Sequence, residues 1–194
     1  MAKARKTTRD PWKTKVWYRV HAPGEFNKAD IGTTPASDPE LLPGRVIRTS
    51  LADLSGDRRD FKKQKQKLDF RITTVKGMDA ESEFVGHTIT RDYERSLGKR
   101  GGSKFYGRFL VKTSDGKDVK VKIVGVAAKA LTRSREAEIS SRTLDILQKS
   151  AKENVLSDFI QNLLFGKLGS QMFTSANKIY PMKLIVISRT EVLS

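Results

Sequence analysis

The chain has 194 residues, of which 37% are hydrophobic and 31% are charged, so it can form one domain with an apolar core and a highly charged surface. It carries 38 Lys and Arg side chains against 22 Asp and Glu, and it has no cysteine, which excludes disulfides, thiol nucleophiles and cysteine zinc sites. It has no N-terminal apolar stretch typical of a signal peptide and no apolar run long enough to cross a membrane, so we expect a cytoplasmic protein.

The positive charge is concentrated in two segments. Residues 1–19 hold 7 basic and 1 acidic side chains, and residues 95–135 hold 12 basic and 2 acidic side chains, within a total net charge of +16. Two such segments repel each other unless a polyanion lies beside them. Lys and Arg replace counterions along a phosphate backbone, so this pattern favours a nucleic acid as the partner.

The N-terminal third predicts an arm followed by strands. Residues 1–15 are expected to form an extended basic arm, because Trp12 is almost their only apolar anchor; a solvated tail is the alternative. A strand is expected at residues 16–20. A long loop should follow, punctuated by proline and glycine, and then a second strand at residues 45–51.

Alternating polarity marks the next strands. Leu68, Phe70 and Ile72 alternate with polar residues, which predicts a half-buried strand. Gly77 should end this strand, and residues 83–90 could return beside it.

The clearest local signal is a hairpin from Lys104 to Ala128 that turns at residues 114–116. A two-residue loop would mix apolar and basic side chains on each face, whereas a three-residue loop with a left-handed Gly116 keeps them apart. The three-residue loop gives three apolar pairs: Val111 with Val119, Phe109 with Val121, and Gly107 with Ile123. The other face then carries four cations: Arg108, Lys112, Lys120 and Lys122.

Helical periodicity replaces the strand pattern after Arg133. Helices are expected at residues 136–153 and 155–164, and Ser170 could cap a short helix that runs through Asn177. The apolar run at residues 182–188 predicts a final strand that is central or well covered.

This order of elements predicts an α+β fold. Its largely antiparallel sheet is expected to close into a barrel-like core, flanked by C-terminal helices and a final strand. We expect one domain over residues 16–194, rich in strands over 16–128 and helical over 133–178.

Backbone phosphates are the expected targets of the basic segments. Glycines at residues 98–104 would let the main chain approach a phosphate, although the spacing of a P-loop is absent, and the alternative is a flexible loop. Lys129, Arg133 and Arg135 could extend the cationic surface, or simply solvate the start of a helix. The predicted RNA-binding residues are Lys3, Arg5, Lys6, Arg9, Lys13, Lys15, Arg95, Lys99, Arg100, Lys104, Arg108, Lys112, Lys120, Lys122, Lys129, Arg133 and Arg135.

Two further features are ambiguous from sequence. Trp12, Trp17 and Tyr18 could stack on bases, but at least one of Trp17 and Tyr18 is expected in the core because both lie on a strand. The basic run at residues 62–67 has acidic neighbours, so local neutralisation competes with RNA contact as its explanation. Those neighbours are Asp57, Asp60 and Asp69.

Catalysis finds no support in the sequence. His21 and His87 are far apart, and no metalloprotease, hydrolase or dinucleotide motif is present. Asp53, Asp57 and Asp60 could bind a metal in a nuclease, but acidic residues scattered in a loop are usually solvated. We therefore expect no enzyme activity, no catalytic residue, no metal and no cofactor.

Landmarks along nearly the whole chain resemble the archaeal and eukaryotic small-subunit ribosomal protein family eS-one, also called S-three-Ae. Each landmark is weak alone, and their order and spacing together carry the resemblance. They are Asp10-Pro11-Trp12, Trp17-Tyr18, Ala22-Pro23 with Phe26, Ile31-Gly32-Thr33, Gly44-Arg45-Val46, residues 50–54, the stretch from Gly86 through Thr90-Arg91-Asp92, residues 113–116, the helix after Arg133, and Ile179-Tyr180-Pro181.

The resemblance implies a structural, rRNA-binding protein on the platform of the small ribosomal subunit, near the mRNA exit. It implies a barrel-like β core with flanking helices, contact with neighbouring platform proteins, and possible contact with mRNA and initiation factors. The chain stops at Ser194 without the long charged extension of eukaryotic members, so an archaeal-type short form is expected.

Two other classes of function remain open from sequence. A dissociable RNA-binding translation or assembly factor would share the charge pattern. A metal-dependent nucleic-acid enzyme would need activity that is sensitive to Asp53, Asp57 or Asp60.

Overall fold

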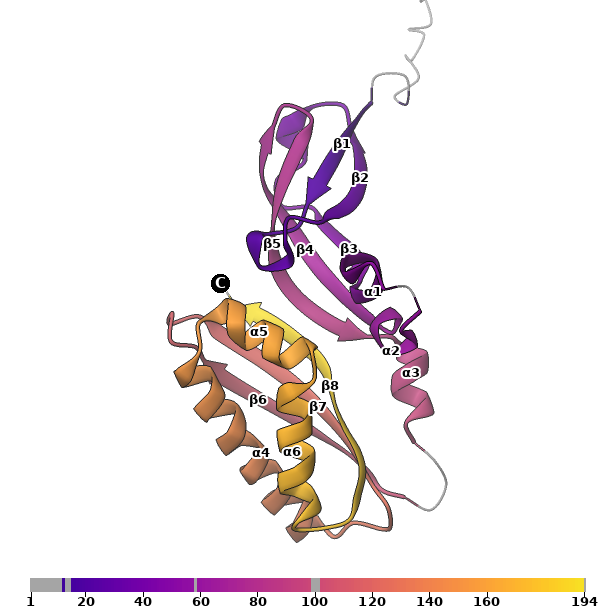
Figure 1. Cartoon of the computed structure of the whole chain (residues 1–194), viewed down its shortest axis with the longest axis vertical. Coiled ribbons are helices and arrows are strands. Elements are labelled where there is room, and N and C mark those ends of the chain that lie inside the picture. Colours follow the sequence, from indigo (N-terminus) through magenta and orange to yellow (C-terminus); the bar gives the residue numbers. More distant parts are fainter. Residues whose placement is uncertain (1–11, 13–14, 58, 99–101, 194) are drawn as a thin grey trace, which may run out of the picture. The chain divides into compact units, whose positions relative to one another are not determined.

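The computed structural model describes Trp12 and residues 15–57, 59–98 and 102–193. These residues form two compact units (Figure 1). The first unit holds the described part of residues 1–48 together with residues 70–84. The second unit holds the described part of residues 49–69 and 85–193. A single folding domain over residues 16–194 stays a prediction.

Within the described residues the chain forms eight strands and six α-helices (Figure 1). The strands are β1 (Val16–His21), β2 (Asp30–Ala36), β3 (Val46–Ser50), β4 (Gln66–Lys76), β5 (Asp79–Ile89), β6 (Lys104–Lys112), β7 (Asp118–Ala127) and β8 (Met182–Leu193). The helices are α1 (Leu51–Ser55), α2 (Phe61–Gln64), α3 (Arg91–Ser96), α4 (Arg133–Glu153), α5 (Leu156–Leu164) and α6 (Lys167–Asn177). Two short 3₁₀ helices are Gly24–Phe26 and Pro39–Leu41.

The strands form one sheet, and together with the helices they give the predicted α+β fold. Its strand order is β2-β1-β5-β8-β7-β6, with β4 also paired to β5 and β3 to β4. The pairs β1–β2, β5–β8, β6–β7 and β7–β8 are antiparallel, whereas β1 and β5 pair in parallel. The expected closure into a barrel is not confirmed, because no pairing among the described strands joins β2 to β6. The sheet branches instead at β5, which uses residues 79–81 for β1 and residues 86–88 for β8.

Strand β2 corrects the prediction of a long loop after the first strand. Pro35 suggested a loop, because proline cannot donate a ladder hydrogen bond. In the structure Pro35 lies on β2, opposite Trp17 of β1. Strand β2 is an end strand of the sheet. An edge position tolerates the missing N–H, so a proline there does not prevent a strand from forming.

The predicted alternation in β4 gives this strand one buried face. Leu68, Phe70 and Ile72 are 0%, 0% and 1% exposed, which confirms that they share a buried face. The ring of Phe70 packs edge-on against Phe26, with 5.4 Å between ring centroids. A further cluster surrounds Ile72; its other buried members are Tyr18, Val20, Ala36, Leu42 and Ala80.

In the second unit, α4, α5 and α6 pack on one another, and α4 and α6 pack against the sheet at β6 and β8 (Figure 1). Helix α4 confirms the predicted helix at residues 136–153 and begins three residues earlier, at Arg133. The buried residues of this helix are Ile139, Thr143, Leu147 and Ala151. Ile146 is half-buried.

The last two elements are longer than predicted. Helix α6 begins at Lys167, and its N-cap is Gly166 in the left-handed region with φ of 79°, so Ser170 is not the cap. The Ser170 hydroxyl lies inside the helix and donates to the Gly166 carbonyl at 3.0 Å. Strand β8 continues five residues past the expected end at Ser188, to Leu193, and lies between β5 and β7, which confirms its central position.

Candidate nucleic-acid interface

The hairpin of β6 and β7 adopts the predicted register. Val111 lies opposite Val119, Phe109 opposite Val121, and Gly107 opposite Ile123. The Thr113 amide donates to the Lys117 carbonyl at 3.0 Å, which closes the three-residue loop, and Gly116 has φ of 76°. A left-handed residue at this position is what the three-residue hairpin loop requires.

The two faces of this hairpin differ in polarity, as predicted. Val111, Val119, Val121 and Ile123 are 0–2% exposed and form the core side. On the opposite face Arg108, Lys112 and Lys120 are exposed, and Lys122 is half-buried. We call this opposite face, together with the adjoining part of β8, the open face.

Strand β8 adds a cation to the open face that the sequence analysis missed. Arg189 lies opposite Lys122, and Glu191 lies opposite Lys120. Arg189 is exposed and forms an ion pair with Glu191. The predicted strand ended at Ser188, although the alternation of charged residues with β-branched ones over residues 189–192 (Arg-Thr-Glu-Val) was a usable signal for its continuation.

These side chains surround a hollow of about 220 Å³ on the open face. Its lining residues are Arg108, Lys120, Val121, Lys122, Arg189 and Glu191. Four cations against one carboxylate produce a positive potential that attracts phosphate groups.

Helix α3 places a carboxylate beside this surface. Glu94 Oε1 lies 3.4 Å from Nζ of Lys122, and its Oε2 accepts a hydrogen bond of 3.1 Å from the Ser188 hydroxyl. Nζ of Lys104 donates to the backbone carbonyl of Glu94 at 2.5 Å. Lys104 and Lys122, both predicted RNA-binding residues, are therefore also engaged within the protein.

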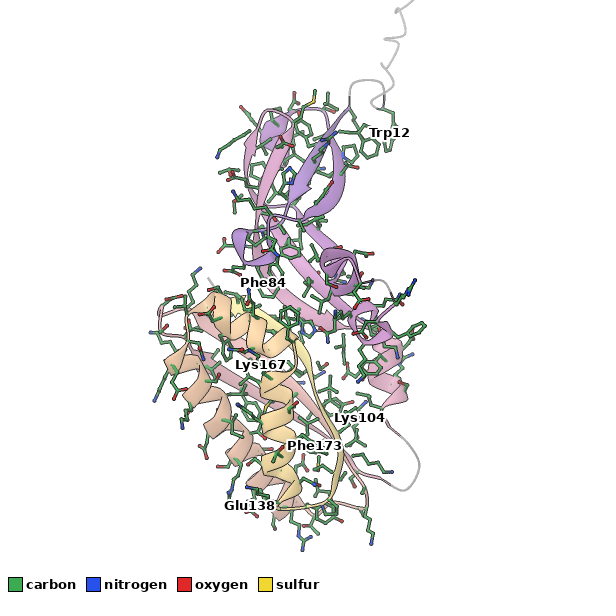
Figure 2. The ribbon with its side chains drawn as sticks, in the orientation of Figure 1. Trp12, Phe84, Lys104, Glu138, Lys167 and Phe173 are labelled. Carbon is green, nitrogen blue, oxygen red and sulfur yellow. The ribbon has the colours of Figure 1, made fainter. Side chains whose placement is uncertain are left out.

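An aromatic ring lies between these two lysines. Tyr106, at the register position beside Val124, is 49% exposed. Nζ of Lys104 is 5.3 Å from the ring centroid and Nζ of Lys122 is 5.0 Å from it. Figure 2 shows Lys104 at the start of β6. An exposed ring flanked by cations can stack on a base while the cations contact the phosphates. Sequence reasoning missed Tyr106 because the alternation analysis counted only the charged residues of this face.

The remaining predicted cations of the second unit are exposed. Lys129, Arg133 and Arg135 lie at and before the start of α4, and Arg95 lies on α3. The guanidinium of Arg135 is 4.9 Å from the ring centroid of Tyr180. Lys99 and Arg100 lie outside the described residues.

The first unit presents the end of the basic arm. Nζ of Lys15 lies 3.9 Å from the ring centroid of Trp12. Trp12 and Trp17 are 63% and 59% exposed, whereas Tyr18 is 6% exposed and belongs to the core, as expected for one of the pair on β1. The other arm cations lie outside the described residues: Lys3, Arg5, Lys6, Arg9 and Lys13.

The carboxylates that could have formed a nuclease site have other partners. Asp57 pairs with Nζ of Lys63 at 3.2 Å, which shows local neutralisation within the basic run. Asp60 caps α2 by accepting from the Lys62 amide at 2.9 Å, and Asp53 contacts the Ser50 hydroxyl at the start of α1. Among the described residues no group of three or more His, Asp or Glu side chains is arranged to hold a metal ion. Within the same part of the chain, no helix is both long and apolar enough to span a membrane.

Comparison with known proteins gives a match over nearly the whole chain. The model of the ribosomal S3Ae family matches residues 3–194. The small ribosomal subunit protein eS1 of Methanobrevibacter smithii is 38% identical over 193 residues, covering 100% of this chain and 98% of that protein. The protein of the same name from Methanothermobacter thermautotrophicus is 36% identical, with 100% and 98% coverage. The one from Desulfurococcus amylolyticus is 36% identical, with 99% and 89% coverage.

Proposed function

The chain belongs to the ribosomal S3Ae family, and from that premise we propose that it is a structural constituent of the small ribosomal subunit that binds rRNA through the open face. Membership of a family whose relatives are named as small-subunit proteins supports the ribosomal role. A place in the small subunit also locates the protein in the cytoplasm. Its relatives here come from archaea, in agreement with the expected archaeal-type form.

The hollow on the open face is the observation that carries rRNA binding. Arg108, Lys120 and Arg189 line it from the adjacent strands β6, β7 and β8. The helices α4 and α6 pack against the same sheet. Phosphate contacts position a protein without reading sequence, and an A-form groove is recognised by its shape. The open face therefore binds the rRNA backbone, and the basic arm supplies a second set of phosphate contacts.

The position within the subunit is part of the same proposal. We place the protein on the platform near the mRNA exit, beside other platform proteins, with mRNA and initiation factors within reach. The helical part of the C-terminal third, residues 136–178, supports a protein-facing role, because it holds 5 basic and 5 acidic side chains and therefore has no net positive charge to attract phosphate.

Gradient sedimentation of a native lysate, with ribosomes washed in high salt, tests this function. The expected result is that the chain stays with the small subunit at about one copy per particle. If salt moves it to the light fractions, the protein is a dissociable RNA-binding translation or assembly factor instead.

A charge-reversal pair tests the open face itself. Arg108→Glu with Lys120→Glu should move the protein out of the small subunit, because phosphate contacts become repulsive. The matched control is Lys149→Glu with Lys167→Glu, which gives the same change in net charge at exposed positions of α4 and α6 (Figure 2 labels Lys167). Normal incorporation of the first variant would show that the open face does not anchor the protein.

A further inference from the structure

Strand β8 has a neighbour along its whole length on one side only. Toward β7 it stays paired down to Met182. Toward β5 it is paired at three positions, where residues 86–88 lie opposite residues 189–191. Strand β5 then ends at Ile89, and the chain turns into α3 (Figure 1). Within the described residues, no strand pairs with this side of β8 over residues 183–187, which we call the free edge.

A groove of about 490 Å³ runs along the free edge. All five residues of the free edge line it, although successive side chains of a strand point to opposite faces of a sheet. A run of consecutive lining residues therefore indicates that the edge of the strand, with its backbone, faces the groove. In an antiparallel pair every second residue directs its N–H and C=O away from the partner strand. The free edge thus presents backbone donors and acceptors that can template another strand.

The groove also has accessible apolar walls. Phe173 of α6 and Tyr93 of α3 are half-buried lining residues, and so are Leu184 and Val186 of the free edge (Figure 2 labels Phe173). A ligand that suits this groove brings apolar groups to these side chains and hydrogen-bonding groups to the strand edge.

The charge of the groove has one sign. Lys62 of α2 and Lys183 of the free edge are exposed cations among the lining residues. No Asp or Glu is present in the described lining. The potential of the groove is therefore positive, and it favours a ligand that carries carboxylates.

We propose that the groove binds an extended, acidic segment of a neighbouring protein, which pairs its backbone with the free edge and packs apolar side chains against Phe173 and Tyr93. In strand addition, main-chain hydrogen bonds give affinity, and pockets for alternate side chains give specificity. RNA fits less well, because its backbone lacks the alternating N–H and C=O groups of a strand and would place phosphates against apolar walls. That the neighbour is a small-subunit protein rests on the proposed function; the site on β8 does not.

Binding of short synthetic peptides to the purified full chain tests the site directly. The probe is a fluorescent, end-capped peptide in which Val alternates with Glu. We expect saturable binding with a dissociation constant of about 0.1 mM. A peptide with Lys in place of every Glu should bind at least tenfold more weakly, because the groove is cationic. Absence of saturable binding by the acidic peptide would overturn the proposal.

Backbone methylation of the same peptide distinguishes strand pairing from general apolar adhesion. Methyl groups on every second amide remove the donors from one edge of the peptide strand, and methylation of the other set removes them from the opposite edge. One of the two methylated peptides should bind at least tenfold more weakly than the other. Equal affinities would show that the peptide does not pair with the free edge.

A groove-filling substitution locates the bound peptide. A Cβ atom built on Gly169, which lines the groove on α6, meets nothing within 4 Å, so Gly169→Leu can occupy the space without a backbone clash. The matched control is Gln171→Leu, an exposed position on the same helix that does not line this groove. Gly169→Leu should weaken peptide binding at least tenfold, whereas Gln171→Leu should leave it unchanged. Unaltered binding by the folded Gly169→Leu protein would overturn the site.

A fluorescent uridine oligonucleotide covers the alternative ligand. Its binding should be the same in Gly169→Leu and in the wild type, because we place RNA on the open face. Oligonucleotide binding that Gly169→Leu abolishes would assign the groove to RNA and overturn the proposal.

The peptide and sedimentation experiments can fail independently of each other. Arg108→Glu with Lys120→Glu should reduce subunit incorporation and leave peptide binding intact. A chain that binds the acidic peptide but does not sediment with the small subunit would keep the site and reject the ribosomal role. A chain that sediments with the small subunit but binds no peptide would do the reverse.

Discussion

The carboxylate of Glu94 lies 3.4 Å from the ammonium group of Lys122, on the surface that we propose for rRNA binding. The side chains of Lys122 and Glu94 are 31% and 21% exposed, so this ion pair is only partly screened by solvent. The same carboxylate also accepts from Ser188 on β8. Glu94 therefore fixes α3 against β7 and β8 and lowers the positive charge that the open face offers to phosphate.

Replacing this carboxylate should strengthen RNA binding. In Glu94→Gln the cation of Lys122 is available to a phosphate, so we expect tighter binding of small-subunit rRNA and a salt dependence that is steeper by about 0.7–0.9. The loss of a partly exposed ion pair should cost at most about 1 kcal/mol of unfolding free energy. Filter binding at several salt concentrations measures the slope.

Glu138→Gln is the matched control for this change, because Glu138 pairs with Arg142 on the exposed side of α4 (Figure 2 labels Glu138). It removes the same charge far along the sequence from α3 and should leave the slope unchanged. Weaker rRNA binding by Glu94→Gln would show that the position of α3, rather than the charge of Lys122, controls the open face.

The two lysines of β7 on the open face should respond differently to charge reversal. Lys120 is exposed, so Lys120→Glu should impair incorporation into subunits while changing the melting temperature by less than about 2 °C. Lys122→Glu places a second carboxylate beside Glu94 and should lower the melting temperature by several degrees. Thermal unfolding of both purified variants makes the comparison. Equal melting temperatures would mean that α3 moves away from the new carboxylate with no loss of unfolding free energy.

Deletion of residues 1–15 should weaken rRNA binding and reduce its salt slope, because the segment carries six basic side chains and one acidic side chain. The melting temperature should change little. A variant with the same fifteen residues in shuffled order should bind like the wild type, since phosphate contacts do not read sequence. An unchanged salt slope in the deletion would remove the arm from the RNA-binding surface.

The stability of the protein should fall on acidification through His87. Its folded pKa of about 4 is below the ordinary histidine value of about 6.5, so between these pH values the unfolded chain binds a proton that the folded chain does not. The free energy of unfolding should therefore be fully retained above about pH 6.5, decline as the pH falls, and level off near pH 4, with a total loss of roughly 3 kcal/mol.

Urea unfolding between pH 4 and pH 8 measures this profile, and His87→Phe provides the comparison. The difference between the two profiles isolates the contribution of His87, whose surroundings include the charge of Asp69 on β4. Parallel profiles over the whole range would show that His87 titrates normally in the folded protein.

Local pattern was sufficient where the interaction partners are close in sequence. The alternation on both sides of Gly116 fixed the register of β6 and β7 and separated Arg108, Lys112 and Lys120 from the apolar face. Helices α4 and α5 were found within a few residues of their bounds, because helical periodicity persists over several turns. The order of short landmarks along the chain was sufficient to identify the ribosomal S3Ae family.

What the sequence missed depends on which distant segments become neighbours. Pro35 is compatible with a strand only because β2 lies at an edge of the sheet, and Arg189 joins the open face only because β8 pairs with β7. The contact of Glu94 with Lys122 spans 28 positions and its contact with Ser188 spans 94. His87 is buried on β5, in the segment that pairs with β8, where it lies opposite Thr190. Periodicity reports how each segment divides its own polar and apolar sides, whereas charge neutralisation and burial are set by atoms that the fold brings together from elsewhere in the chain.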